Sequence, residues 1–414
     1  MVRPVHGPHR RFTSVRLRNA DPGWVVVVAC CFVTFGVWNA NVGFGVFLPV
    51  LSHEFGWSRG AISLAASLQL IAGGTIAFAV GAASDRFGPR LVLALSSVVS
   101  GAAFLLTSAV GALWHFYLLQ GVLLGIGMAG MYLVPMATVA HWFTEKRGLA
   151  FGIILAGLNL AFVTGAPLSA FLIAGFGWRT AFRVLGGLVW VLTVPASLLT
   201  RLPPPGRIRV ARSSTTVAQG VTFREALRDR RLWLLGLTWA LTGIAQMMIM
   251  VHIVPYLLDR GVTLGSASLA LTIFGISSIA GSLVVGAGAD RIGARSAFGG
   301  CALLQCVTLA WILVGSSLPV LYVLVFWFGL GASGSNAIFV KTAPEVFGVR
   351  AIGAISGALS LGWRIGSALG PSVAGFLYDA TGSYVVAFTV AVASLGVGFV
   401  SFALSVTSPR QHPA

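Results

Sequence analysis

The apolar stretch from about Ala351 to Leu377 carries one basic residue, Arg364, near its centre. A charged side chain at that depth of a bilayer is costly, so it marks a functional position by default. A guanidinium binds a carboxylate through two parallel hydrogen bonds, so we expect Arg364 to hold an anion in a cavity. An arginine satisfied by backbone carbonyls and water is the alternative. Spacings of four, four and three place serines on its helical face, and we expect this face to line the cavity: Ser356, Ser360 and Ser367.

Other polar side chains inside apolar stretches are candidates to contact hydroxyl or carbonyl groups of the same ligand. Each by itself is equally compatible with a hydrogen bond between helices. With Ser360, they are Asn39, Asn41, Tyr132, Asn159, Gln246 and Asn336. On another side of the Arg364 stretch, three glycines predict close contact with a neighbouring helix: Gly362, Gly366 and Gly370.

His252 is the only histidine well inside an apolar stretch. Imidazole has an unperturbed pKa of about 6.5, so His252 is a candidate to carry a coupled proton. A satisfied interfacial histidine beside Pro255 is the alternative. The sequence does not decide between the two.

The ten acidic residues lie in tails, in loops or at the ends of apolar stretches. The chain has no nucleophile elbow, Walker loop, metal-ligand cluster or paired carboxylates within a stretch. Its four cysteines show no metal-site spacing, and we interpret them as small buried hydrophobes. We therefore expect no enzyme, no ATP-driven pump, no metal and no other cofactor.

These residues are positioned by apolar stretches that are long enough to cross a bilayer, which takes about 20 residues. Hydrophobic residues make up 57% of the chain and charged residues only 9%, whereas soluble domains have about 25% charged residues. The sequence predicts an all-α membrane protein with twelve spans in two sets of six. They begin near Trp24, Ala61, Leu91, Trp114, Gly148, Trp178, Leu232, Ser266, Ser296, Pro319, Ala351 and Tyr384.

The net charge of +17 indicates topology and not nucleic-acid binding, because the basic residues concentrate between spans on one side. With the N-terminus inside, cytoplasmic segments hold twenty-two of the 27 Lys and Arg. We expect a multi-pass protein of a cell membrane, the inner membrane in a bacterium, with both termini cytoplasmic. The predicted parts are an N-terminal tail 1–23, a first half 24–200, a proline- and arginine-rich linker 201–231, a second half 232–406 and a C-terminal tail 407–414.

A sequence repeat relates the two halves. The segment 80–90, VGAASDRFGPR, recurs 205 residues later as 285–295, VGAGADRIGAR, with seven of eleven positions identical. A weaker echo relates Ala166-Pro167 to Gly370-Pro371. Both copies of the longer motif lie between the second and third span of their half.

The pattern G-x-x-x-D-R-x-G-x-R, present twice, resembles the signature of the major facilitator superfamily, and the resemblance covers essentially the whole chain. It implies parallel halves around a substrate site near the midplane. It also implies a latch in which Asp85 lies near the start of the eleventh helix and Asp290 near the start of the fifth. The six latch residues are Asp85, Arg86, Arg90, Asp290, Arg291 and Arg295.

Two further segments resemble signatures of the monocarboxylate transporters in that superfamily. They are 21–24, DPGW, before the first span, and 143–152, FTEKRGLAFG, before the fifth. Glu145 stands where the second signature prefers a basic residue. Oxalate–formate transporters, which are similar, place a lysine in helix eleven and an arginine in helix eight, but here helix eight has no cation before Arg291.

Together these features predict a secondary transporter for a small organic anion, most simply a monocarboxylate because the cavity holds one cation. Its partners would be that anion, the lipid bilayer and a co-transported proton on His252. Anion exchange is the alternative to proton symport. A drug/proton antiporter fits less well, since such exporters show a buried acid and an arginine in helix four, where this chain has Gln120. A transport-like sensor is a third interpretation.

Overall fold

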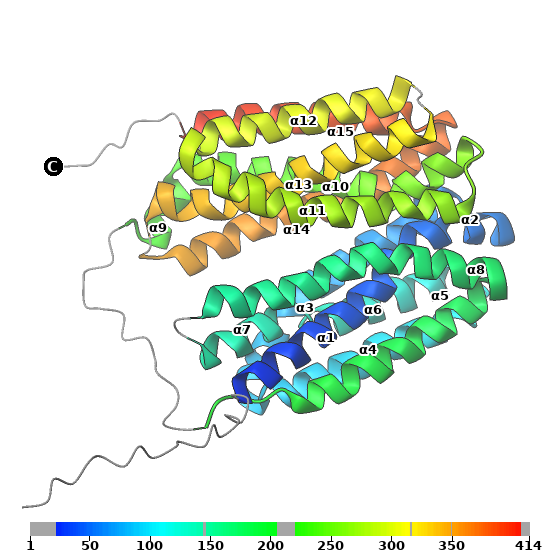
Figure 1. Cartoon of the computed structure of the whole chain (residues 1–414), viewed down its shortest axis with the longest axis horizontal. Helices are drawn as coiled ribbons and strands as arrows, with labels where there is room; N and C mark the ends of the chain where they lie inside the picture. Colours follow the sequence, from blue (N-terminus) through cyan, green and yellow to red (C-terminus); the bar gives the residue numbers. More distant parts are fainter. Residues whose placement is uncertain (1–21, 144–145, 205–219, 315–316, 349, 407–414) are drawn as a thin grey trace, which may run out of the picture.

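The computed structural model describes residues 22–143, 146–204, 220–314, 317–348 and 350–406, and the regular elements in these ranges are helices. Figure 1 shows two bundles side by side, with α1 to α8 in one half and α10 to α15 in the other. The helices are α1 (Pro22–Val42), α2 (Phe44–Phe55), α3 (Arg59–Phe87), α4 (Pro89–Thr107), α5 (Leu113–Phe116), the π-helix η1 (Tyr117–Leu123), α6 (Leu124–Met128), α7 (Leu133–Trp142), α8 (Arg147–Leu199), α9 (Phe223–Arg228), α10 (Arg230–Asp259), α11 (Leu264–Ile292), α12 (Ala294–Val314), α13 (Leu318–Phe347), α14 (Ile352–Thr381) and α15 (Val385–Val406).

Ten helical segments of the described chain are long and apolar enough to cross a membrane. One of them, in α8, holds two spans, because the chain turns at Gly177, whose φ of 77° suits glycine. The 30-residue α14 is not among the ten, since its glycines, its serines and Arg364 lower its hydropathy. Counting both gives the twelve spans expected from the sequence, so the predicted all-α membrane class is confirmed.

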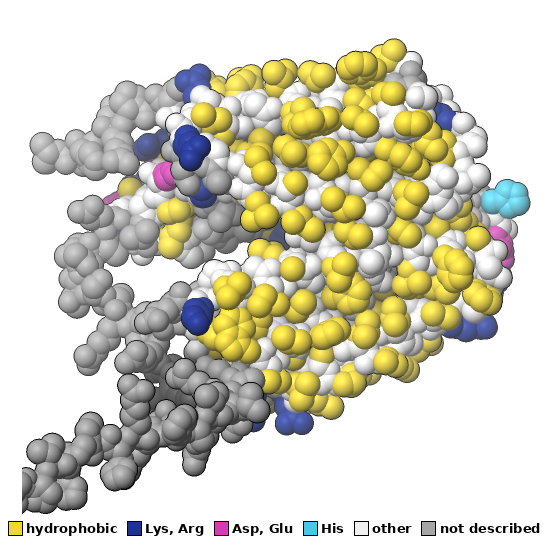
Figure 2. Space-filling model, viewed as in Figure 1, with side chains coloured by type: hydrophobic (Ala, Val, Ile, Leu, Met, Phe, Trp, Pro, Cys, Tyr) yellow, Lys and Arg dark blue, Asp and Glu magenta, His cyan; other side chains and the backbone are white. Residues whose placement is uncertain are grey.

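The outer surface suits lipid. Large apolar side chains such as Phe78 and Val314 are more than four-fifths exposed. Figure 2 shows apolar side chains over the flanks of both halves, while charged side chains gather toward the two ends of the molecule. We call the end where α1 begins and α15 ends the linker end, and the opposite end, with the α2–α3 turn, the far end (Figure 1).

Glycines bring the helices of each half into close contact. A Cβ added to Gly362, Gly366 or Gly370 of α14 would lie within 2.6 Å of a backbone oxygen of α10. In the first half, Gly157 and Gly165 of α8 approach the backbone of α1 in the same way. The prediction of close contact at the three α14 glycines is confirmed. Because this side of α14 packs on α10, a different side of the helix faces the other half.

The fourth span is broken. It runs through α5, η1 and α6, leaves the helix at residues 129–132 and resumes as α7. A π-helical turn and a break inside a span often occur at functional sites. Tyr132 directly precedes α7 and is 36% exposed.

The linker is partly helical in the described residues. A capping box begins α9, in which Thr222 Oγ1 accepts from Glu225 N and Thr222 N donates to the Glu225 carboxylate. The bond from that backbone N–H lowers the pKa of Glu225. Val221 N donates to Phe347 O, so this part of the linker is attached to the second half.

Candidate functional site

The two halves meet through α3 and α14, which run antiparallel, and through α8 and α11. At the far end Gly60 packs on Gly375, and a Cβ on Gly375 would lie 2.6 Å from Gly60 Cα. Farther along, the hydroxyls of Ser67 and Ser372 are 2.6 Å apart. The contact reaches the middle of both helices at Gly74, where an added Cβ would lie 3.3 Å from Arg364 Nη1.

Beyond Arg364 toward the linker end, the same two helix faces are not in contact. A Cβ added to Gly81 of α3, or to Gly353 or Gly357 of α14, would meet no atom of the described residues within 4 Å. Figure 2 shows a hollow between the halves that opens at the linker end. Arg364 therefore lies where the contact between the halves gives way to this hollow.

Arg364 is partly buried, and no hydrogen bond or ion pair joins it to any other residue that the structure describes. Across the interface it faces Gly74, which has no side chain to occupy the space beside the guanidinium. Buried charges are normally paired, so this position favours a ligand of opposite charge.

The serine face around Arg364 is only partly as predicted. Ser360 and Ser356 are partly buried, one and two turns closer to the linker end than Arg364. Ser367 is fully buried, and its hydroxyl lies against Gly243 of α10 in the same half. The prediction that Ser367 lines the cavity is therefore wrong in this conformation, because the close α10–α14 packing covers it.

Four of the predicted amide ligands form hydrogen bonds between helices of one half. Asn39 donates to Thr164 Oγ1 at 2.6 Å, and Asn336 donates to Gln246 Oε1 at 3.3 Å. Asn41 Oδ1 accepts from Gln69 Nε2 at 2.8 Å. Two oxygens of the group, Asn39 Oδ1 and Asn336 Oδ1, are buried without a partner among the described residues, so each retains an acceptor for water or a ligand.

Asn41 and Gln246 are separated by the 205 residues that also separate the two motif copies, so they hold equivalent places in the two halves. The sequence analysis missed Gln69, although a glutamine inside an apolar stretch was a visible signal. Asn159, Tyr132 and Ser360 have no side-chain hydrogen bond to the residues that the structure describes.

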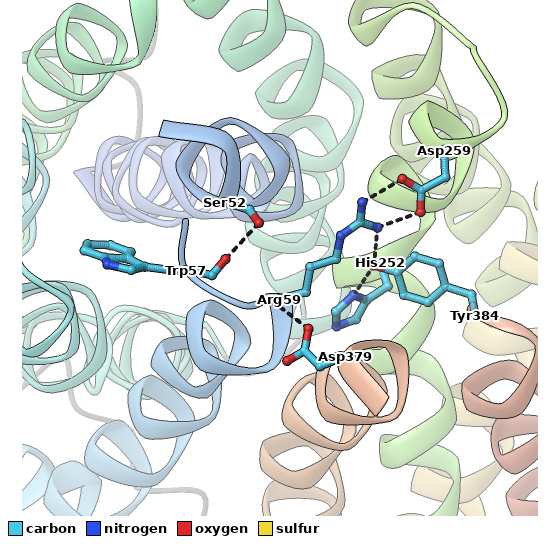
Figure 3. A network of polar contacts seen from close by, with 7 residues as sticks. All are labelled: Ser52, Trp57, Arg59, His252, Asp259, Asp379 and Tyr384. Atoms are coloured by element: carbon cyan, nitrogen blue, oxygen red, sulfur yellow. Dashed lines mark hydrogen bonds and ion pairs between the residues drawn. The ribbon is translucent and has the colours of Figure 1, made fainter. Parts of the chain in front are cut away.

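The far end is closed by a network across the halves, which we call the far-end gate (Figure 3). Arg59, the first residue of α3, forms two hydrogen bonds with the Asp259 carboxylate, at 2.7 and 2.6 Å. Its guanidinium also lies 4.0 Å from the centre of the Tyr378 ring. Asp379 at the end of α14 accepts from the N–H groups of Arg59 and Gly60, at 3.0 and 2.8 Å, and so caps α3 from the other half.

His252 lies beneath this gate and is fully buried. Its Nδ1 is 3.0 Å from the Tyr384 hydroxyl, to which Arg59 Nη1 donates at 3.1 Å. Its Nε2 is 2.9 Å from Pro371 O and 3.3 Å from Ser63 Oγ. Figure 3 shows that the histidine ring and the arginine guanidinium both approach the hydroxyl end of this tyrosine. The sequence singled out His252 but not its partners Ser63, Pro371 and Tyr384, because they belong to three segments distant from it in the chain.

The predicted latch residues lie at the linker end, where the halves are apart. Asp85, Arg86, Arg90, Arg291 and Arg295 are exposed, and no ion pair or hydrogen bond joins their side chains to the rest of the described chain. The side chain of Asp290 lies outside the described residues. The contact of Asp85 with the start of α14 stays a prediction, for a conformation closed at this end.

Comparison with known proteins decides the family. The model of the Major Facilitator Superfamily matches residues 28–266 and 240–414. The chain belongs to this superfamily. The transporter's fold resembles that of a bacterial homologue of the human lysosomal transporter Spinster in an inward-facing conformation, with a TM-score of 0.73 at 16% identity over 93% of this chain and 96% of the other. The nucleoside transporter NupG gives a TM-score of 0.75 at 12% identity, covering 94% and 100% of the two chains.

Among curated relatives, the transporter resembles the monocarboxylate branch, as the sequence analysis inferred. Monocarboxylate transporter 11 of Homo sapiens is 27% identical over 88% of this chain and 79% of its own length. Monocarboxylate transporter 13 of Rattus norvegicus is 28% identical, with 91% and 87% covered. The probable sulfoacetate transporter SauU of Cupriavidus necator is 26% identical, with 94% and 96% covered.

Proposed function

We propose that this transporter carries a small organic anion, a monocarboxylate, by alternating access between its two halves. The observation that supports this most directly is Arg364, a cation without a partner among the described residues, where the contact between the halves meets the hollow. The names of the relatives point to the same chemistry, since carboxylates and sulfoacetate are small organic anions. One guanidinium suits a ligand with one carboxylate.

The excess of Lys and Arg in segments at the linker end makes that end cytoplasmic by the positive-inside rule. In that orientation the conformation described here faces inward, with Arg364 open to the cytoplasm and closed off from outside by the far-end gate. In the outward-facing state, the gate residues part and the faces of α3 and α14 meet at the linker end, where the latch residues lie.

The remaining polar groups are then available to parts of the substrate other than its carboxylate. Asn39 Oδ1 and Asn336 Oδ1 offer acceptors, one from each half. Ser360 lies one turn from Arg364 and can donate or accept, and Tyr132 precedes the resumed helix of the broken span. Asn159, partly buried in α8, adds an amide from the first half. Such groups favour a carboxylate that carries a hydroxyl or carbonyl oxygen.

Proton symport is the coupling mode we prefer, with His252 carrying one proton for each anion. His252 supports this because it is the one histidine buried within a described span, and it contacts both halves through Ser63 and Pro371. Anion exchange remains the alternative, and the two differ in their response to a pH gradient. Symport predicts that an inward proton gradient drives accumulation of the anion above its equilibrium level. Exchange predicts no such effect.

The deciding experiment is uptake of radiolabelled monocarboxylates into proteoliposomes by the wild type and by Arg364→Ala. We expect Arg364→Ala to abolish uptake and exchange, because the carboxylate loses its counter-charge, while Arg364→Lys keeps part of the activity. Arg260→Ala is the matched control, because Arg260 is exposed at the far end and lies on the Tyr256 ring. Normal carboxylate affinity in folded Arg364→Ala would refute the proposed anion site.

A further inference from the structure

The hydrogen bonds of His252 define which atoms of its ring carry hydrogen in this conformation. Pro371 O can only accept, so Nε2 at 2.9 Å must donate. Nδ1 faces the Tyr384 hydroxyl at 3.0 Å. If the ring is neutral, Nδ1 accepts the one hydrogen of that hydroxyl, and every polar atom of the ring is satisfied.

The Tyr384 hydroxyl is also an acceptor for Arg59 Nη1 at 3.1 Å. A proton on Nδ1 would turn this nitrogen into a second donor toward the same oxygen. The hydroxyl hydrogen would then lose its acceptor, and two cations, imidazolium and guanidinium, would share one oxygen. The closed gate therefore fits a neutral His252 and disfavours a charged one.

Neither carboxylate of the gate can hydrogen-bond to such an imidazolium without giving up a donor that it already has. Arg59 occupies both oxygens of Asp259, and the first N–H groups of α3 occupy both oxygens of Asp379. Ionisable side chains surround His252 on each of the helices that pack against it. They are Arg59 of α3, Tyr256 and Asp259 of α10, Tyr378 and Asp379 of α14, and Tyr384 before α15.

We infer that Arg59 and Tyr384 are positioning residues that link the proton on His252 to the far-end gate: the gate closes on the neutral imidazole and opens when the ring is protonated. This inference rests on the proposed function in treating His252 as the proton carrier. Linkage makes the effect reciprocal, so protonation from the far side holds the gate open as strongly as closure expels the proton.

The linkage gives the proton a route through the transport cycle, and the proton gradient sets its direction. With the gate open, water from the far side reaches His252 and protonates it. With the gate closed, His252 is fully buried on that side. The proton then leaves toward the linker end. The hydroxyls of Ser67 and Ser372 are the next polar groups along the α3–α14 contact in that direction. Each cycle moves one proton from the far side to the linker side without any covalent step.

The test measures gate opening without a substrate. In a variant whose four cysteines are replaced by serine, Ser372→Cys places one thiol beneath the gate, and a membrane-impermeant maleimide is added from the far side. His53→Cys, at an exposed far-end position, serves as the reference in a parallel variant, because it corrects for the pH dependence of thiol reactivity. We expect the labelling of Cys at 372 relative to the reference to rise at least about fivefold as the pH falls through the histidine range.

Three variants then identify the residues responsible. His252→Gln, which keeps a donor for Pro371 O, is expected to make the labelling ratio independent of pH. Tyr384→Phe removes one hydroxyl and keeps the ring packed on Tyr378 and Phe388, and it is expected to flatten the response. Arg179→Gln breaks an ion pair with Glu54 that lies within the first half at the same end, and it should behave as wild type.

The inference would be overturned if the labelling ratio did not depend on pH with the wild-type gate. It would also be overturned if Tyr384→Phe kept the full pH response. Failure of the proposed function looks different. In that case the vesicles take up and exchange no carboxylate, while the substrate-free labelling still responds to pH. Conversely, carboxylate exchange that depends on Arg364 together with pH-independent labelling supports the anion site and refutes the gate linkage.

Discussion

The two ends of the α3–α14 pair differ in how they hold the halves together. At the far end, Gly60 and Gly375 allow the backbones to touch, and Asp379 caps the first turn of α3. At the linker end, Gly81 and Gly357 on the same two faces have no neighbour across the interface. The chain thus supplies glycines for close approach at both ends, but only one end is in contact. If the halves alternate as proposed, the linker-end glycines would come into contact when the far end opens.

The ends also differ in where their charges come from. The motif at the linker end is one contiguous segment repeated in each half, so it was visible in the sequence. The far-end gate joins Arg59, Asp259, Asp379 and Tyr384, which belong to four segments without a shared motif. The gate residues were therefore not visible as a motif in the sequence, whereas the predicted latch residues were.

We expect the largest effect from a bulky side chain introduced into the α3–α14 interface at either end. Gly375→Val places side-chain atoms against Gly60 and Arg59, so the far-end gate should fail to close and uptake should be lost. Gly81→Val meets no neighbour here, but it should block closure at the linker end and also abolish uptake. Far-side labelling of Cys at 372 should rise in the first variant and fall in the second.

Gly396→Val is the matched control for both substitutions, because this α15 glycine has no atom within 4 Å of an added Cβ. It should transport normally. Normal uptake by Gly81→Val would show that the α3 and α14 faces never meet at the linker end, contrary to the two-contact interpretation.

A smaller effect is expected from Asp259→Asn, which removes the carboxylate bound by Arg59. The pair is partly exposed, with 14% and 33% of the two side chains accessible, so solvent weakens it. We expect a loss of about 1 kcal/mol from the closed gate, or roughly a fivefold shift toward the outward-facing state. Far-side labelling at several salt concentrations measures the shift, which should shrink as salt rises.

Glu54→Gln is the control for Asp259→Asn, since it removes the carboxylate of the Arg179 pair within one half. Its labelling should equal that of the wild type. An equal shift in both variants would mean that general surface charge, and not the gate, sets the equilibrium.

The smallest effect concerns the amide pairs inside each half. Asn41→Leu leaves Gln69 Nε2 with only the Met128 sulfur as acceptor. We expect a loss of about 0.6 kcal/mol in stability, since interhelical hydrogen bonds in membranes contribute little each. Thermal unfolding in detergent measures it, and Asn159→Leu, which removes an amide with no such bond in the described chain, should shift the unfolding temperature less. A large loss of carboxylate affinity in Asn41→Leu would instead place Asn41 in the binding site.

Hydropathy, the repeated motif and the basic segments were enough to predict the twelve spans and the superfamily, because each of these signals is local in the chain. They also singled out Arg364, since a lone cation inside an apolar stretch is visible without a structure. The side of α14 that faces the other half was only partly predictable. Close packing of glycines on α10 buried Ser367, and sequence periodicity does not show which neighbour a helix face meets.

By itself the sequence determined the class of protein and the position of one cation. Only the tertiary structure decided which end is closed, that Arg364 lies at the limit of the contact between the halves, and that His252 hydrogen-bonds to Tyr384 beneath Arg59. The physical reason is that spans are fixed by local hydropathy, whereas a gate is made by side chains that meet only when helices from both halves pack against one another.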